Sequence, residues 1–119
     1  MPTIRDVVQA LARRDGVDAV VLLGSDGLPI DSQAAPGGGL DAEVVAAHLP
    51  PLVHACDELG QHAGRGALAT AVVEYAAGYA VVTDLSRDVK LLVLLGPGAS
   101  LGPLLYDLSR HRAQIAGLL

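Results

Sequence analysis

The side chains best suited to chemistry gather between residues 48 and 62. They comprise three histidines and two acids: His48, His54, His62, Asp57 and Glu58. Two metal ligands on one helix must lie four residues apart to share a face, and this spacing singles out Glu58 with His62. His48 and His54 are six residues apart and would point in different directions. The pattern therefore predicts polar surface contacts rather than a metal site.

A second candidate is the glycine-rich stretch at residues 96–102, between an apolar run and a helical pattern. Such loops can direct backbone amides at a phosphate group. Gly96, Gly98 and Gly102 fit neither the dinucleotide fingerprint nor the phosphate-binding loop, and the one lysine of the chain, Lys90, precedes them. We therefore expect a loop and a helix cap, with no nucleotide, metal or other cofactor bound by the chain itself.

Nucleophilic catalysis would need a serine or cysteine beside a histidine and an orienting acid. The serines fall at turns, strand ends, a helix start or a helix surface, and no nucleophile-elbow pattern surrounds any of them. The lone cysteine, Cys56, has apolar neighbours and is interpreted as core filling. Asp107 and His111, four residues apart on the last helix, are interpreted as a helix-stabilising pair. No catalytic site is expected, so the chain is predicted not to be an enzyme.

The composition is that of one folded domain spanning residues 1–119. Hydrophobic residues make up 51% of the chain and charged residues 18%, which excludes a disordered polypeptide. No apolar run approaches the roughly 20 residues of a membrane-spanning helix. Residues 1–16 have a charged amphipathic pattern rather than the apolar stretch of a signal peptide. We expect a soluble, cytoplasmic protein.

The charges are unevenly distributed along the chain. Residues 15–63 hold eight acidic side chains and neither lysine nor arginine, and the net charge is −5. This distribution argues against nucleic acid as a partner. Five arginines lie in the two terminal segments, where solvated helix faces account for most of them.

Hydrophobic periodicity predicts three helices and five strands in the order αββαβββα. The predicted helices cover residues 3–14, 41–62 and 101–118, and the predicted strands cover 17–23, 28–34, 67–75, 79–85 and 89–95. Thr3, Asp41 and Ser100 are the expected helix caps, and Gly16 is expected in a left-handed conformation. The second helix should bury one stripe, formed by Val45, Leu49, Leu52, Cys56 and Leu59. A flexible loop is expected at the glycines 37–39.

Prolines and apolar runs place some of these elements. Pro29 cannot donate a hydrogen bond to a neighbouring strand, so its strand should lie at a sheet edge. The unbroken apolar run 91–95 is typical of a central strand covered on both faces. Pro50 and Pro51 should bend or divide the second helix, because Leu49 precedes a proline and is disfavoured in the helical conformation.

The element order, the phrase GVDAVVLLGSDGLPIDS at 16–32 and the ending KLLVLLGPGASLGPLLYDL at 90–108 resemble the roadblock/LC7 family. This resemblance implies a mixed α/β (α+β) fold. Its five-stranded antiparallel sheet would have the order 2-1-5-4-3, with helix two on one face and helices one and three on the other. Bacterial members are typically homodimers that partner small Ras-like GTPases. They include gliding-motility regulators that stimulate GTP hydrolysis without supplying an arginine finger.

Two surfaces of the predicted fold are candidates for protein contacts. The strand at 67–75 would form a sheet edge whose stretch 68–73 is apolar and uncharged and needs a cover. The predicted dimer interface is therefore Val45, Leu68, Thr70 and Val72. The second helix has an outer face of small residues that would allow another backbone to approach closely. The residues predicted to bind the GTPase on this face are Ala47, His48, Pro51, Ala55, Glu58 and His62.

Three functions remain open from the sequence. The first is a homodimeric module that regulates or scaffolds a Ras-like GTPase, with or without stimulation of GTP hydrolysis. The second is a structural adaptor dimer that has no effect on nucleotide turnover. The third is a small-molecule sensor, which is the weakest of the three because the predicted core of Ala, Val and Leu offers no convergent polar groups.

Overall fold

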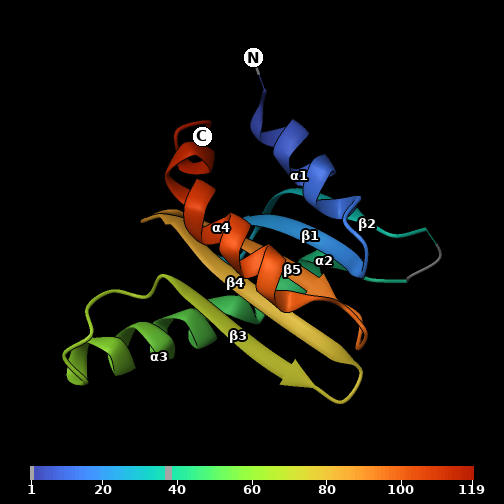
Figure 1. Ribbon diagram of the computed structural model, residues 1–119. Helices are drawn as coiled ribbons and strands as arrows, with labels where there is room; N and C mark the ends of the chain where they lie inside the picture. Colours follow the sequence, from blue (N-terminus) through green and yellow to red (C-terminus); the bar gives the residue numbers. More distant parts are fainter. Residues whose placement is uncertain (1, 37–38) are drawn as a thin grey trace.

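The computed structural model describes residues 2–36 and 39–119 (Figure 1). Two of the three glycines in the predicted flexible loop, at 37 and 38, fall outside the described residues, as does residue 1. The elements in chain order are α1 (Ile4–Ala12), β1 (Val17–Gly24), β2 (Pro29–Ala34), α2 (Ala42–Ala47), α3 (Leu49–His62), β3 (Thr70–Tyr75), β4 (Gly78–Ser86), β5 (Val89–Leu95) and α4 (Leu101–Ala116).

The five strands form one antiparallel sheet in the order β2-β1-β5-β4-β3. This arrangement confirms the predicted α/β fold and strand order. Pro29 lies on the edge strand β2, as expected of a residue without an amide hydrogen. β5 is central, with Leu91, Val93 and Leu95 packed into one core cluster and Leu92 into the other.

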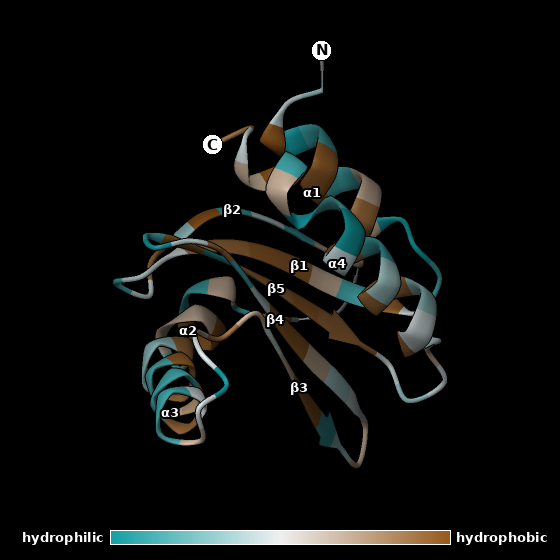
Figure 2. Cartoon of the chain, turned by 60° about the vertical axis from the view of Figure 1, so that its left-hand side comes forward, coloured by the Kyte–Doolittle hydropathy of each residue, from teal (hydrophilic) through white to brown (hydrophobic). Residues whose placement is uncertain are grey.

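Helices cover both faces of the sheet (Figure 2). Val8 and Leu11 of α1 and Leu104 and Leu108 of α4 pack on one face. On the opposite face, the buried helical residues come from α2 and from the start of α3: Ala46 and Leu49. This division confirms the predicted placement of the helices.

The predicted helix 41–62 is divided at His48 into two abutting helices. Asp41 caps α2, and its carboxylate accepts the amides of Glu43 and Val44 at 3.0 and 3.4 Å. Pro50 and Pro51 lack the amides that would continue α2, yet they fit the first turn of α3, where amides have no partner within the helix. The predicted break is confirmed, but its predicted detail is wrong. Leu49 is the first residue of α3 and remains helical.

Several boundaries differ from those predicted by periodicity. β3 begins at Thr70 rather than at residue 67, because the amide of Leu68 is bonded to a side chain instead of to a neighbouring strand. β2 begins at Pro29, so Leu28 lies in the preceding turn. At the first helix, Thr3 and Asp6 form a capping box. Gly16 has the predicted left-handed conformation, with φ of +85°.

The turn between β3 and β4 depends on the absence of a side chain at Gly78. This residue is buried and has φ of +149°, a conformation that residues with a side chain rarely adopt. A Cβ atom at this position would overlap the carbonyl oxygen of Leu95. The close approach keeps the start of β4 against the end of β5.

Candidate interaction surface

The six residues predicted to bind a GTPase share one property in the structure: all are exposed. We call this outer surface of the two abutting helices the α2–α3 platform: Ala47, His48, Pro51, Ala55, Glu58 and His62. Val44 and Leu59 are also exposed on α2 and α3 and add apolar area. The two helices therefore offer small and apolar groups to the solvent.

The inner face of α3 is poorly covered within the chain. Leu49 is its buried residue, whereas Leu52 and Val53 are half-buried. Cys56 is also half-buried, so it fills the core only in part. The prediction that Leu59 belongs to the buried stripe is wrong, because its side chain is 69% exposed. The helix extends beyond the sheet (Figure 1), so its last turns have no strand to pack against.

Two polar side chains of α3 make a contact that was not predicted from their spacing. His54 Nε2 lies 3.3 Å from Glu58 Oε1, and these residues are four apart on one face. The sequence analysis named only Glu58 and His62 as having this spacing, although His54 is also four residues from Glu58. Residues 2–36 and 39–119 contain no cluster of three metal-ligating side chains.

The four residues predicted for the dimer interface do not form one cluster in the single chain. Val72 is 43% exposed on the free edge strand, and it lies opposite Val81, which packs beneath α4. Thr70 Oγ1 is 3.4 Å from the buried Thr83 Oγ1. Val45 packs on the other face of the sheet, and Leu68 is half-buried just before β3.

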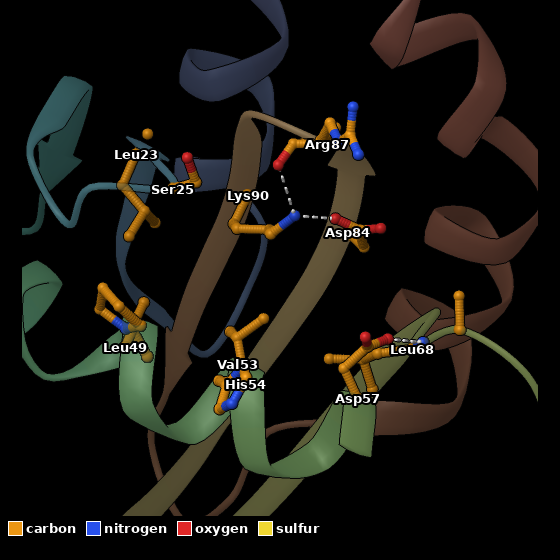
Figure 3. Close-up of a pocket in the computed structure, with 13 residues that line it drawn as sticks. Leu23, Ser25, Leu49, Val53, His54, Asp57, Leu68, Asp84, Arg87 and Lys90 are labelled. Atoms are coloured by element: carbon orange, nitrogen blue, oxygen red, sulfur yellow. Dashed lines mark hydrogen bonds and ion pairs between the residues drawn. The ribbon is translucent and has the colours of Figure 1, made fainter. Parts of the chain in front are cut away.

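A pocket of about 460 Å³ lies behind the α2–α3 platform, between α3 and the β4–β5 hairpin. Figure 3 shows Val53 and Asp57 of α3 on one wall and Asp84 and Lys90 of the hairpin on the other. Lys90 Nζ donates to Asp84 Oδ1 and to the carbonyl oxygen of Ser86 at 2.9 Å. The expectation of no convergent polar groups concerned the core, where Thr83 is the buried polar side chain among the described residues. Asp57, Asp84 and Lys90 lie outside that core, at the walls of the pocket.

The signal for this hairpin pair is present in the sequence. Asp84 and Lys90 flank the turn at 87–88 almost symmetrically, and the structure places them as direct cross-strand neighbours. Opposite charges at such positions are favourable in antiparallel sheets. By contrast, Asp57 lies on a separate helix, and its position in the sequence does not indicate that it accepts a hydrogen bond from the amide of Leu68.

The remaining sequence candidates have structural roles. The predicted pair of Asp107 with His111 does not form. Arg14, in the turn after α1, approaches Asp107 to 2.6 Å instead. His111 instead contacts Gln114 at 2.9 Å. In the glycine-rich loop, the amide of Gly96 donates to the carbonyl oxygen of Gly16 at 2.9 Å. This bond agrees with the predicted loop, because the Gly96 amide is not directed outward toward a phosphate.

A comparison with protein-family models matches residues 3–95 to the Roadblock/LC7 domain. The chain belongs to the Roadblock/LC7 family. Domains of this family generally regulate or connect other proteins rather than catalyse reactions. Among the described residues, no helix is long and apolar enough to cross a membrane.

Relatives of the Roadblock/LC7 chain are similar along most of its length. Two uncharacterized proteins of Methanocaldococcus jannaschii are 29% and 27% identical over 112 residues. The alignments cover 94% of this chain and 92% and 96% of those proteins, respectively.

Solved structures share the fold at lower sequence identity. Myxococcus xanthus MglB has a TM-score of 0.84 at 20% identity, with 97% of this chain and 93% of that chain covered. The gliding protein MglB of Thermus thermophilus has a TM-score of 0.84 at 15% identity, covering 97% and 87%. A Roadblock/LC7 domain from Streptomyces avermitilis has a TM-score of 0.78 at 22% identity, covering 92% and 91%.

Proposed function

We propose that this Roadblock/LC7 chain is a homodimeric docking module that regulates or scaffolds a small Ras-like GTPase in the cytoplasm. The observation that carries the proposal is the incomplete coverage of α3 and β3 within one chain. Apolar side chains on an edge strand and on a helix usually have a partner. The resemblance of the sequence to GTPase-partnering members of the family supplies the class of that partner.

Dimerisation is the first step of the proposal. β3 pairs with β4 on one side only, and its other edge carries no lysine, arginine or proline. Pairing of β3 with its symmetry mate would satisfy the free backbone groups and cover Val72. The half-buried residues Leu52 and Val53 of α3 would then face the second copy across the same seam. The description of one MglB structure as a tetrameric arrangement supports self-association as a property compatible with this fold.

GTPase docking on the α2–α3 platform is the second step. The platform has small residues at Ala47 and Ala55, which permit close approach of another backbone. An arginine finger needs an arginine on an exposed, positioned element, but neither α2 nor α3 contains one. The proposed module therefore acts by shape and by rearranging the GTPase's own residues. Glu43 and Glu58 favour a basic surface on the partner.

Regulation and scaffolding differ in their effect on the rate of GTP hydrolysis by the partner. A Ras-like GTPase from the same genome, loaded with GTP, is mixed with increasing amounts of the dimer, and both binding and GTP hydrolysis are recorded. Saturable binding with faster hydrolysis supports the regulator, whereas saturable binding with an unchanged rate supports the adaptor. The absence of binding at micromolar concentrations, in both nucleotide states, contradicts the proposal.

A further inference from the structure

The pocket between α3 and the β4–β5 hairpin has the size and the lining of a small-molecule site. Its volume of about 460 Å³ lies within the roughly 300–1,000 Å³ typical of ligand pockets. Leu23, Leu49, Val53 and Leu68 provide apolar lining, and a few charged groups lie among them. None of the α2–α3 platform residues lines this cavity, whereas Val53 and Leu68 line it and also belong to the expected dimer contacts.

The ammonium group of Lys90 on the hairpin wall has its hydrogen-bond partners within the chain. The side chain of Lys90 is 13% exposed, and its ammonium group donates to Asp84 and to the carbonyl oxygens of Ser86 and Arg87. An ammonium group has three donors, so Lys90 has none left for a ligand. The guanidinium group of Arg87 extends away from α3 (Figure 3). The hairpin wall therefore offers no free cation directed into the cavity.

On the opposite wall, the carboxylate of Asp57 can still accept hydrogen bonds. Asp57 Oδ1 accepts the amide of Leu68 at 2.8 Å, whereas Oδ2 has no hydrogen-bond partner within residues 2–36 and 39–119. Every buried side-chain oxygen in that part of the chain has a hydrogen-bond partner. Because Oδ2 has none, it is not buried and is accessible to solvent. A carboxylate accepts several hydrogen bonds. Asp57 thus combines a fixed orientation with a free acceptor beside the apolar lining.

We propose that this pocket binds a small organic cation, a primary ammonium compound with a short apolar body. The ammonium group would donate to Asp57 Oδ2, and the body would pack against Val53 and Leu68. An anionic ligand would meet Asp57 and Asp84, while Lys90 is already bonded and the guanidinium group of Arg87 extends away from α3. A neutral apolar ligand would leave the accessible carboxylate unused. The proposal concerns the chain alone and does not depend on a GTPase partner.

The test uses three probes that share one body and differ in charge: hexylammonium, hexanol and hexanoate. Binding to the full chain is followed by NMR chemical-shift titration, with assigned amides of residues 53, 57, 68 and 90 as reporters. Hexylammonium should bind about tenfold more tightly than hexanol, as expected of one charge-assisted hydrogen bond. Hexanoate should bind more weakly than either. Equal affinity for the ammonium and the alcohol, or tighter binding of the carboxylate, overturns the proposal.

Matched variants locate the binding site. Asp57→Asn retains an oxygen that can accept the Leu68 amide but removes the charge, so it should abolish the tenfold preference for hexylammonium. Glu58→Gln removes the neighbouring charge on the α2–α3 platform and should leave the preference unchanged. A preference that survives in Asp57→Asn places the cation elsewhere and contradicts the assignment. If Asp57→Asn fails to fold, the comparison of the three probes on the unaltered chain still decides the charge preference.

Discussion

Asp57 on α3 accepts a hydrogen bond from the backbone amide of Leu68, eleven residues further along the chain, at 2.8 Å. This bond joins α3 to the segment that leads into β3. Few buried contacts hold α3 otherwise, since Leu49 is its buried residue. The position of the helix behind the α2–α3 platform therefore depends on a polar contact as well as on packing.

Asp57→Ala should lower the free energy of unfolding by about 1–2 kcal/mol, because it leaves the Leu68 amide without its acceptor. Asp57→Asn should cost less, since its amide oxygen can replace the carboxylate. Urea denaturation followed by circular dichroism measures both changes. Glu58→Ala is the matched control on the exposed side of α3, with an expected change within about 0.5 kcal/mol. Equal effects of Asp57→Ala and Glu58→Ala would show that the Leu68 contact contributes little.

Gly78→Ala should be among the most destabilising single substitutions in the chain, at about 3 kcal/mol or more. The added Cβ would overlap the carbonyl oxygen of Leu95, and the φ of +149° would be strained in any case. Gly98→Ala is the control, because a Cβ there has open space and its φ is not positive. Thermal melts of the two variants should differ by many degrees. Similar melting temperatures would mean that the turn between β3 and β4 can rearrange.

The proposed dimer seam predicts that Val72→Lys weakens self-association by placing a charge on each side of the paired edges. Light scattering at micromolar concentration should give twice the chain mass for the unaltered protein and a lower mass for this variant. Ile30→Lys is the matched control, since Ile30 is exposed on the opposite edge strand β2. A monomer before substitution, or an identical loss of mass in Ile30→Lys, would contradict the β3 seam.

Much of the fold could be predicted because its signals are local. Pro29 indicated an edge strand, and the apolar run of β5 indicated a strand covered on both faces. The break in the second helix was predicted from Pro50 and Pro51, although its position was misplaced. The steric restriction on a residue before proline is a preference, and packing keeps Leu49 helical in the first turn of α3.

Contacts between distant residues were the part that the sequence did not reveal. Asp57 reaches Leu68, and Arg14 reaches Asp107, through the arrangement of separate elements. The spacing of Asp107 and His111 predicted a pair on one helix, but the guanidinium group of Arg14, in the turn after α1, contacts the same carboxylate. Predicting the contact between Arg14 and Asp107 would have needed the position of the turn after α1 relative to α4. The pair His54–Glu58, by contrast, has a local spacing that could have been recognised.

The central claim is that the α2–α3 platform docks a Ras-like GTPase, and Ala55→Arg tests it most directly. Ala55 is exposed on α3, so the substitution should leave the thermal melt nearly unchanged while placing a bulky cation within the proposed contact. Ala113→Arg makes the same change at an exposed position of α4 and serves as the control. The measurement is titration of the three proteins against a Ras-like GTPase loaded with a non-hydrolysable GTP analogue. The account predicts binding by the unaltered chain and by Ala113→Arg, and none by Ala55→Arg. Equal binding by all three proteins would contradict it and place the contact elsewhere, with α1 and α4 as the next candidates.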